Sequence, residues 1–532
     1  MDLHKINSKK FLVLFFILLY YNSFSQTWPQ IYGDAISAYG RDVLESYDKG
    51  FLICGSIDKN AELFKFGWLI KTDINGNILW DKKFGDFNVE NFFIDFDKTD
   101  DEGLILCGAT AQVDSWRDPL FVKLDPCGEI EWCKIYLSAQ MNHATGVIHL
   151  PDGQFLGMLE YYGGEAQDIR ISLVKMDAEG EPIWIKHLAQ EDSTITNEEG
   201  RYLDLMPDSN YLVSGSGFSP LTPYFIKTDT TGEEFWHLKW PIGAGGFAGR
   251  SVFTQNGTIY NATQLKISNS PKVPYLLKFN NYGEVISQYA IMGDTIYNGG
   301  AQSLLVNNDT TIYIGLTWTN DHSLFTGFCE IYKTDTAGNL LLHRLLLDDE
   351  HAPTNIINSL EGKIVAIGTF AVDSNWDIYM WKMNQNLEDD TLYTQPLTYD
   401  SLCPYEIQSD TVALDCGLFV NIDELPTQEQ YESSIKISPN PARDWVVLTL
   451  PDVVAPVAVE VQVYDVFGRE VGTRRPGDRE TRGKGEEGTE RRGEMPVNRM
   501  VLLDVSGHAS GMYIVVATDQ KGRRYTGKVV VR

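Results

Sequence analysis

The sequence predicts an all-β fold, a seven-bladed β-propeller of four-stranded blades followed by a small C-terminal β-sandwich. Two observations carry most of this prediction: a short block of residues recurs seven times at near-constant spacing, and an apolar strand precedes every copy. The composition is a third. Aromatic residues make up 12% of the 532-residue chain and Gly contributes 46 residues, which suits many short strands joined by tight turns.

The recurring block has the pattern Lys-x-Asp-x-x-Gly-x-x-x-Trp in four complete copies, and three further copies are degenerate. The seven copies begin at Lys71, Lys123, Lys175, Lys227, Lys278, Lys333 and Lys382. The intervals between them are 52, 52, 52, 51, 55 and 49 residues. Such regular spacing indicates a repeat architecture with one structural unit per copy.

An apolar strand precedes each block, and one more alternating segment, such as Arg41–Tyr47 or Arg201–Met206, precedes that strand. The apolar strands are Phe51–Gly55, Leu104–Gly108, Phe155–Met158, Tyr211–Gly215, Ile259–Asn261, Ile312–Gly315 and Ile364–Gly368. Each period therefore holds four short strands, which is the size of one propeller blade. Seven blades fall within the usual range for this architecture.

The Asp-x-x-Gly core of the block is typical of a hairpin turn. An Asp side chain accepts hydrogen bonds from its own backbone, and Gly supplies the positive φ that closes the turn. We interpret Asp73, Asn75 and Asn77 in this way, because the twelve-position pattern of a calcium loop with its final Glu is missing. The Trp then falls on the next strand, where we expect it to pack one blade against its neighbour.

The N-terminal segment Trp28–Gly33 resembles the Trp strand of the repeat but precedes the first complete unit. We infer that it completes the last blade and so closes the ring. The alternative is Thr391–Pro396, which follows the seventh block in chain order. One of the two is expected to be the outer strand of the seventh blade. The propeller is therefore assigned residues 26–398.

The first 25 residues have the three parts of a secretory signal peptide. Lys5, Lys9 and Lys10 precede an apolar stretch at residues 11–21, and small polar residues follow. A membrane-spanning helix needs about 20 apolar residues, so this stretch is too short for an anchor. The predicted cleavage site lies between Ser25 and Gln26. No later segment has the required length, and we expect no transmembrane helix in the mature chain.

Charge is distributed unevenly along the chain. The net charge is −29, and residues 26–430 hold 25 Lys and Arg against 58 Asp and Glu, while residues 431–532 hold 16 against 14. An acidic body repels the phosphate backbone, so nucleic acid is not expected as a partner. We interpret the acidity as a solvated surface rather than as a cation-binding one.

The cysteines lie in the predicted exported part of the chain. A disulfide between Cys403 and Cys416 is predicted, because the two lie close together in residues 399–432, a linker without repeat character, and exported proteins form disulfides. Cys127 and Cys133 flank a predicted turn and are a second possible pair. An odd total of seven leaves at least one free thiol.

Two other cysteines have a structural interpretation. Cys54 and Cys107 occupy the same position in successive repeats. We therefore expect them to lie in neighbouring blades as buried apolar side chains.

From residue 433 the repeat vanishes and a different set of motifs appears. A Pro-Asn-Pro opens the segment, a Tyr-Asp-x-x-Gly-Arg stretch follows, and a Gly-x-Tyr strand and a Lys-Val-Val end close it. The motif residues are Pro439, Asn440, Pro441, Tyr464, Asp465, Gly468, Arg469, Gly511, Tyr513 and Lys528. In these motifs, residues 433–532 resemble the type A sorting domain of the type IX secretion system. The alternating strands between Gly turns agree with a small β-sandwich.

This resemblance implies passage through the type IX secretion machinery, followed by removal of the domain and either attachment of the body to surface polysaccharide or its release. One departure from the family's pattern is the stretch 474–499, which is charged, Gly-rich and almost without apolar residues. Such a stretch cannot bury a core, so we predict a disordered insertion between two strands.

The repeat of the body also resembles known propeller repeats. It is similar to those of quinoprotein-type propellers and of secreted propellers from Bacteroidetes-type bacteria, and more loosely to the Asp-boxes of sialidases. The resemblance covers residues 27–397. These motifs specify a turn and a packing residue, so they imply a fold and no particular activity.

None of the usual catalytic signatures appears in the sequence. His143 and His149 lack ligand-spaced partners, so we interpret them as solvent-facing or packing residues. A ligand site is expected at the mouth of the propeller's central channel. Arg41, Arg201 and Arg250 each follow a Gly at the start of a predicted inner strand and are the candidate ligand-binding residues. The alternative is that they pair with the surplus carboxylates.

We predict an exported protein, secreted or displayed on the outer cell surface, whose propeller binds a carbohydrate, a protein or a particle without catalysis, metal or cofactor. The predicted partners are the type IX secretion machinery, surface polysaccharide and an unidentified carbohydrate or protein ligand. One alternative is a propeller enzyme: a sialidase-like one needs an arginine cluster with an acid and a Tyr in the channel, and a quinoprotein needs a cofactor cavity. The other alternative is a structural surface-layer component.

Overall fold

In a computed structural model, the chain is described from residue 28 onward. The described residues of the body are 28–33, 36–59, 65–86, 88–112, 117–137, 143–163, 168–189, 196–219, 221–240, 245–266, 272–291, 297–320, 327–348, 353–372 and 375–419. Those of the C-terminal part are 436–438, 442–443, 445–449, 460–465, 470–474, 500–509, 511–518 and 524–531. The predicted signal peptide, its cleavage site at Ser25 and Gln26, and all but the first residue of the stretch 474–499 lie outside the described residues.

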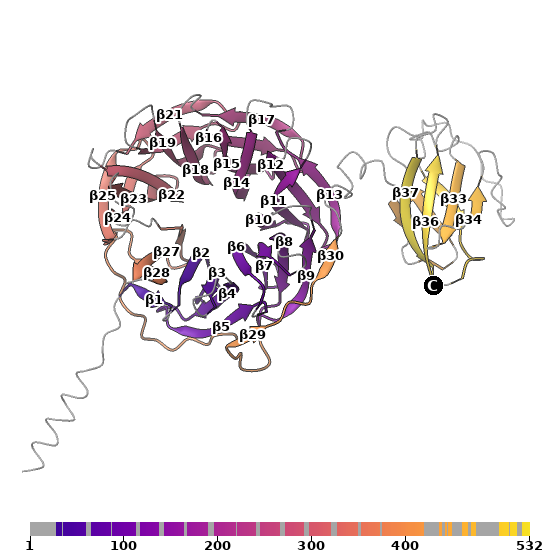
Figure 1. Ribbon diagram of the computed structural model, residues 1–532, viewed down its shortest axis with the longest axis horizontal. Coiled ribbons are helices and arrows are strands. Elements are labelled where there is room, and N and C mark those ends of the chain that lie inside the picture. Colours follow the sequence, from indigo (N-terminus) through magenta and orange to yellow (C-terminus); the bar gives the residue numbers. More distant parts are fainter. Residues whose placement is uncertain are drawn as a thin grey trace, which may run out of the picture. The chain divides into compact units, whose positions relative to one another are not determined.

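Seven four-stranded antiparallel blades form a ring around a central axis, which confirms the predicted propeller and its blade count (Figure 1). Blade 1 holds β2 (Ala38–Glu45), β3 (Phe51–Asp58), β4 (Lys65–Thr72) and β5 (Ile78–Phe84); blade 2 holds β6 (Asn91–Lys98), β7 (Leu104–Thr110), β8 (Asp118–Leu124) and β9 (Ile130–Tyr136); blade 3 holds β10 (His143–His149), β11 (Phe155–Gly163), β12 (Asp168–Met176) and β13 (Pro182–His187). The first strand of each of these blades lies at the centre of the ring.

The remaining blades repeat this order. Blade 4 holds β14 (Thr196–Leu205), β15 (Tyr211–Ser219), β16 (Leu221–Thr228) and β17 (Glu234–Lys239); blade 5 holds β18 (Gly245–Phe253), β19 (Ile259–Lys266), β20 (Val273–Phe279) and β21 (Val285–Ala290); blade 6 holds β22 (Tyr297–Asn307), β23 (Thr311–Asn320), β24 (Gly327–Asp335) and β25 (Leu340–Leu347); blade 7 holds β26 (Asn355–Asn358), β27 (Ile364–Val372), β28 (Asn375–Met383) and β1 (Gln30–Tyr32).

The core of the propeller lies between the blades. The middle strands of blade 2, β7 and β8, have every residue buried. Both faces of these strands are covered by neighbouring blades, which is why apolar residues follow one another in Leu104–Cys107 and Pro119–Val122 instead of alternating with polar ones. Cys54 and Cys107 lie in this core at 0% exposure, in β3 and β7, and neither forms a disulfide. The prediction for the first two is confirmed.

The Asp-x-x-Gly turns form as the repeat predicts. The Oδ1 atom of Asp73 accepts hydrogen bonds from the backbone N–H groups of Asn75 and Asn77, both at 2.8 Å, and Gly76 has a φ of 82°. Asp125, Asp177, Asp229 and Asp335 accept the corresponding pair of bonds in their own turns. Turn formation is thus the role of Asp73, Asn75 and Asn77.

The repeat Trp residues join neighbouring blades. The indole N–H of Trp132 donates to the carbonyl oxygen of Ala178, in the turn of blade 3, at 2.9 Å. A Cβ atom on Gly180 would lie 2.7 Å from the Trp132 ring, so only Gly leaves room for the indole. Trp236 makes the same bond to Asn281 at 3.0 Å. The interblade role predicted for the Trp is therefore confirmed in these blades.

The ring closes through the N-terminal strand. β1 pairs antiparallel with β28, in the register Gln30↔Met380. The hydroxyl of Tyr32, a residue only 3% exposed, donates to the carbonyl oxygen of Gly76 in blade 1 at 2.9 Å. This confirms the N-terminal strand as the outer strand of blade 7. The alternative, Thr391–Pro396, forms no strand.

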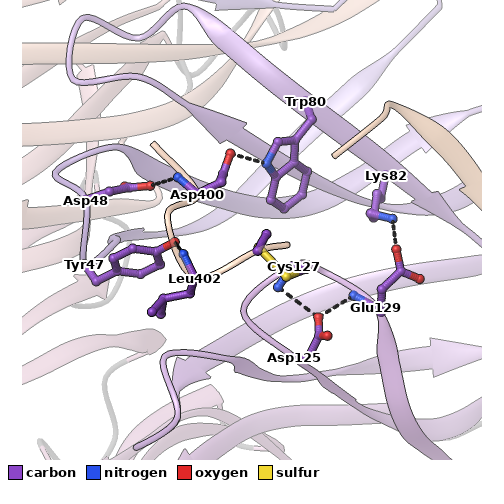
Figure 2. The surroundings of a disulfide bond; sticks show 10 residues. Tyr47, Asp48, Trp80, Lys82, Asp125, Cys127, Glu129, Asp400 and Leu402 are labelled. Atoms are coloured by element: carbon purple, nitrogen blue, oxygen red, sulfur yellow. Dashed lines mark hydrogen bonds and ion pairs between the residues drawn. A yellow bond between two sulfur atoms is a disulfide. The ribbon is translucent and has the colours of Figure 1, made fainter. Parts of the chain in front are cut away.

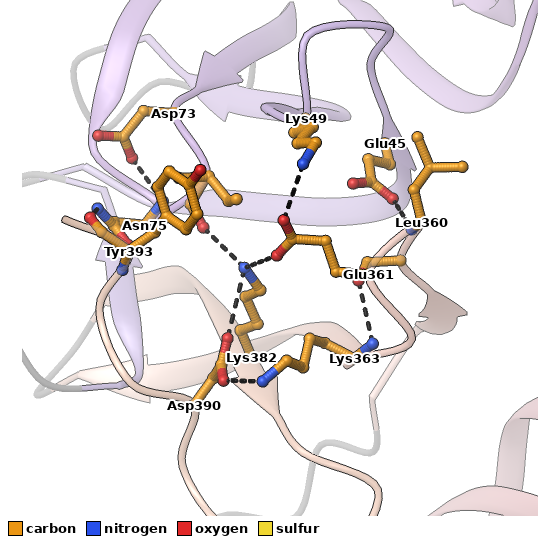
Figure 3. Close-up of polar contacts among 12 residues, drawn as sticks. Glu45, Lys49, Asp73, Asn75, Leu360, Glu361, Lys363, Lys382, Asp390 and Tyr393 are labelled. Atoms are coloured by element: carbon orange, nitrogen blue, oxygen red, sulfur yellow. Dashed lines mark hydrogen bonds and ion pairs between the residues drawn. The ribbon is translucent and has the colours of Figure 1, made fainter. Parts of the chain in front are cut away.

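Ion pairs complete the junction between blades 7 and 1 (Figure 3). Lys382, the lysine of the seventh repeat, donates to the carbonyl oxygen of Ile74 at 3.3 Å and lies 3.5 Å from an Asp390 oxygen. Lys49 of blade 1 forms an ion pair with Glu361 of blade 7 at 3.0 Å. Burial lowers the pKa of Lys382, and the nearby carboxylates oppose that shift.

The segment predicted as a linker, residues 399–432, is instead docked on the propeller over its described part. β29 (Asp410–Val412) pairs in parallel with β5, and β30 (Gly417–Phe419) pairs in parallel with β9. Figure 1 shows this segment running along the outer edges of blades 1 and 2. Both blades thereby become five-stranded.

Hydrogen bonds fix the start of this segment on blade 1 (Figure 2). The backbone N–H of Asp400 donates to the carboxylate of Asp48 at 3.0 Å, and the indole of Trp80 donates to the carboxylate of Asp400 at 3.1 Å. The backbone N–H of Leu402 donates to the hydroxyl of Tyr47 at 3.3 Å.

The predicted disulfide between Cys403 and Cys416 is wrong, and so is the second possible pair, Cys127 with Cys133. Cys127 is bonded to Cys403 and Cys133 to Cys416, across 276 and 283 residues of sequence. The parallel register places Gly417 opposite Lys134, which brings Cys416 beside Cys133. Short sequence separation predicted the wrong pairing, because Cys403 and Cys416 each lie beside a cysteine of blade 2 and not beside one another.

The second compact unit begins at Leu425 and contains two sheets. One sheet holds β31 (Lys436–Ser438), β32 (Trp445–Thr449) and β35 (Met500–Asp504); the other holds β33 (Glu460–Asp465), β34 (Glu470–Arg474), β36 (Gly511–Thr518) and β37 (Arg524–Val531). Val446, Val463 and Val515 are among the residues of their shared core. The two sheets form the predicted small β-sandwich.

The motif residues of this unit are partly described. Tyr464 and Asp465 lie at the end of β33, Gly511 and Tyr513 in β36, and Lys528 in β37. Pro439, Asn440, Pro441, Gly468 and Arg469 lie outside the described residues.

Candidate functional site: the central channel

A cavity of about 520 Å³ occupies the central channel and is lined by residues of all seven blades. Along the inner strands β2, β6 and β14, the last residues that line the cavity are Asp42, Asp95 and Tyr202. No later described residue of these three strands lines it. The cavity therefore occupies the end of the channel where the inner strands begin.

A register shift within the inner strands supplies most of the inner-strand side chains that line this cavity. In blades 1 to 6 the pairing with the second strand skips a position, as between Gly40 and Asp42. Such an extra residue leaves the hydrogen-bond ladder and turns its side chain away from the sheet. The residues at this position that line the cavity are Arg41, Ile94, Thr145, Arg201, Arg250 and Gln302, and Thr354 precedes β26 in blade 7.

The three predicted arginines thus share one cavity, but their surroundings differ. Arg250 of blade 5 reaches Asp42 of blade 1, with nitrogen–oxygen distances of 3.3 and 3.4 Å, and lies 3.8 Å from an Asp95 oxygen of blade 2. Asp42 is 4% exposed and also accepts bonds from Asn355 and from the backbone N–H of Val43. Arg250 therefore crosses the channel and is neutralised there.

Burial shapes the acid–base behaviour around Arg250. Burial, followed by the charge of Asp42, raises the pKa of Asp95 well above its usual range, although Arg250 lowers it. Burial likewise raises the pKa of Asp204 to about 6. The Arg250 guanidinium offsets part of the desolvation cost of Asp95 and Asp204 and so opposes the rise in their pKa values.

Arg41 and Arg201 are less neutralised than Arg250. Arg201 has one carboxylate contact, from its Nη2 to Glu199 at 3.1 Å, and its guanidinium lies over the Phe247 ring at 4.5 Å. Its Nε atom is buried without a hydrogen-bond partner among the described residues. Within the described ranges, no carboxylate forms an ion pair with Arg41. Burial lowers the pKa of Arg41, and the positive charge of Arg201 adds to that effect.

The other cations of the cavity have partners. Arg117 binds Glu90 through two parallel bonds of 2.8 and 2.9 Å. Lys65 lies 3.9 Å from Asp58, and burial lowers its pKa. Two-point contacts of the Arg117 kind are the strong form of this pair.

A histidine and a glutamate form a contact at the wall of the cavity. The Nε2 atom of His143 lies 3.1 Å from an Oε2 atom of Glu160. Burial, with added repulsion from Arg117 and Arg41, lowers the pKa of His143 to about 4, so its ring is neutral at pH 7. Burial raises the pKa of Glu160. Tyr202 lines the same cavity.

All three predicted arginines line the channel, and the alternative interpretation, pairing with carboxylates, holds for Arg250 and Arg201. Their role in ligand binding stays a prediction. His149 packs against Phe155, whereas His143 is a cavity residue that sequence reasoning missed. The signal for its contact was available: His143 and Glu160 are cross-strand partners in one hairpin.

No cluster of three or more His, Cys, Asp or Glu side chains among the described residues is arranged to hold a metal ion. None of their elements is a helix with the length and apolar character needed to cross a membrane.

No family model matches the sequence, and no curated protein matches it either. Among solved structures, a polysaccharide lyase of family PL25, an ulvan lyase bound to -[GlcA(1-4)Rha3S]-, is similar over 67% of this chain and 96% of its own, with 12% identity and a TM-score of 0.44. Drosophila semaphorin 1b, extracellular domains 1–2, is similar over 68% and 87%, with 8% identity and a TM-score of 0.38.

A protein of unknown function from Bacteroides caccae is similar over 50% of this chain and 94% of its own, with 10% identity and a TM-score of 0.32. Likenesses this distant carry no argument about the ligand or the activity of the present chain.

Proposed function

We propose that this chain is an exported, surface-displayed or secreted binding protein whose propeller channel holds part of a carbohydrate. The observation that carries the proposal is the cavity of about 520 Å³, whose lining from seven blades is mostly polar or charged and includes the rings of Phe92 and Tyr202. Sugars offer many hydroxyl groups and apolar ring faces, so a pocket with convergent polar groups and aromatic rings fits them. The two disulfides are consistent with an oxidising, extracytoplasmic location.

Binding in the channel is tested by filling it. The mature full chain is expected to retain a subset of glycans on an array, and Gln302→Trp is expected to abolish that retention. Gln302 is exposed to the channel at the register shift of blade 6, so a larger side chain there enters the cavity without entering the ladder. Leu360→Trp, at a position 77% exposed in blade 7, is the control and should bind as the parent does. Retention of no glycan by the parent would refute the proposal.

A second function, a propeller enzyme acting on the same ligand, is favoured by one observation. The neutral His143 ring, oriented by Glu160, lies in the cavity together with Tyr202. A neutral imidazole beside a carboxyl group is able to exchange a proton with a reacting group, although a pKa of about 4 makes it a weak base at pH 7. Shortening of a retained glycan during incubation, lost in His143→Gln, would establish this function in place of simple binding.

The C-terminal unit is proposed to direct export through the type IX machinery. Support comes from the ordered motifs in the sequence and from the placement of Tyr464, Gly511 and Tyr513 on strands of a compact sandwich. Deletion of residues 433–532 is expected to leave the protein in the periplasm of a host with that machinery, as measured by protease accessibility on intact cells. Surface exposure of the truncated chain would contradict the assignment.

A further inference from the structure

We infer that Arg41 and Arg201 form a subsite for an anionic group, a carboxylate or a sulfate, on the carbohydrate that occupies the channel. The inference rests on the proposed function and deepens it, because it names the chemical class of the sugar. Three features of the described residues support it. Arg41 forms no ion pair among them, Arg201 has donors without acceptors, and the cavity lining holds more cations than carboxylates although the chain as a whole is acidic.

Arg41 is a cation of the channel that forms no ion pair with any described residue. It stands at the register shift of β2, between Gly40 and Asp42, so its side chain leaves the ladder and enters the cavity. No described carboxylate lies within ion-pair distance of it. Arg41 is an exposed residue, so its guanidinium donors face the open space of the cavity and are accessible to an anion that enters it.

Arg201 of blade 4 lines the cavity, and part of its guanidinium has no hydrogen-bond acceptor among the described residues. Among the described residues its one carboxylate contact uses Nη2, and its Nε is buried and forms no hydrogen bond to any of their atoms. The Phe247 ring under the guanidinium holds it in place. A fork of this kind, with donors left open, matches the paired oxygens of a carboxylate or sulfate.

The cavity also differs in charge from the rest of the molecule. Five cations line it, Arg41, Lys65, Arg117, Arg201 and Arg250, against four carboxylates, Asp42, Glu90, Asp95 and Glu199. The chain as a whole carries a net charge of −29. A positive cavity inside an acidic protein attracts small anionic groups selectively, because the surrounding surface repels them elsewhere.

Arg250 and Arg117 are excluded from the subsite by their contacts. Arg250 already faces Asp42 and Asp95, and Arg117 already holds Glu90 through two bonds. Carboxylates of the protein itself therefore offset the charges of these two arginines. The open positions belong to Arg41 and Arg201, from blades 1 and 4.

The test measures sugar binding to the mature full chain by titration calorimetry or NMR. Three probes are used: glucuronate, glucose 6-sulfate and uncharged glucose. At least one acidic sugar is expected to bind about tenfold or more tightly than glucose, and Arg41→Gln and Arg201→Gln are each expected to weaken it by about tenfold. The two acidic probes distinguish a carboxylate from a sulfate. Lys98→Gln, which removes an equal charge from an exposed pair with Glu102, should leave affinity within about twofold.

Several results would overturn the subsite. They are equal affinity for acidic and neutral sugars, unchanged affinity in both arginine variants, or no binding of either acidic sugar at tens of millimolar. If the glycan array nevertheless shows retention of neutral glycans that Gln302→Trp abolishes, the proposed function stands and only the anionic subsite fails. Retention of no glycan removes both.

Discussion

Removal of both disulfides is expected to lower the free energy of unfolding of the propeller by about 5 kcal/mol. Each bond spans more than 270 residues, at separations of 276 and 283, so in the unfolded chain it restricts a long loop. The suitable variant replaces Cys127, Cys133, Cys403 and Cys416 together with Ser, because single replacements leave thiols that re-pair. Urea denaturation measures the loss, and thermal unfolding should shift down by about 6 °C.

Reduction of the parent protein supplies the control. It should reproduce the stability of the fourfold variant, and reductant should not change the variant, because Cys54, Cys107 and Cys329 form no disulfide. Peptide mapping without reductant is expected to show blade 2 peptides joined to tail peptides. A peptide that joins Cys403 to Cys416, or equal stability with and without the bonds, would contradict this prediction.

Arg250→Met is expected to destabilise the protein by about 3–5 kcal/mol at pH 7. The substitution leaves the carboxylates of Asp42 and Asp95, 5% and 16% exposed, facing each other without their counter-charge. Denaturant titration measures the loss. Arg201→Met is the matched control, because it removes an arginine from the same cavity whose partner Glu199 is partly exposed, and it should cost about 1 kcal/mol or less.

The loss in free energy of unfolding that Arg250→Met causes should become smaller as the pH falls from 7 to 5. Burial and Asp42 already raise the pKa of Asp95, and the loss of Arg250, which lowers it, raises it further. The folded variant then binds a proton at a pH where the unfolded chain does not, so acidification stabilises the folded state relative to the unfolded one. A loss that stays constant or grows between pH 7 and pH 5 would show that Arg250 acts through packing rather than charge.

The propeller was predictable because its determinants are local and repeated. The turn at Asp73 is made by bonds to backbone groups two and four residues later, so it is visible in the sequence of a single unit. Even the closing strand was predictable, since Trp28–Gly33 repeats the pattern of the other outer strands. Seven local units of one size leave the chain few other ways to bury its apolar strands.

The disulfide pairing was not predictable from the same information. It depends on the path of residues 399–419 along blades 1 and 2, which is set by contacts such as that of Asp400 with Asp48 across 352 residues. Sequence proximity favoured Cys403 with Cys416, and the docked strand β30 overrides it. No repeat pattern marks where a tail will lie.

The sequence predicted the arginines of the candidate site but not their contacts. The Gly-Arg pairs marked Arg41, Arg201 and Arg250 as special, but the contact of Arg250 with Asp42 joins residues 208 apart. It exists only because the ring brings blade 5 opposite blades 1 and 2. The three arginines therefore differ in their contacts because the closed ring places different residues near each of them, which no single repeat encodes.

Most residues of a sheet both pair with a neighbouring strand and present a side chain. The register shift of the inner strands frees one residue in a blade from strand pairing, so that its side chain only faces the channel. Residues such as Arg41 and Gln302 stand outside the ladder, so neither pairing register nor blade core depends on their identity. Exchange of these side chains alters what the channel presents while the scaffold stays unchanged. Propellers of this design are thus suited to diversify their ligands by point substitution at a few inner positions, much as an antibody framework tolerates new loops.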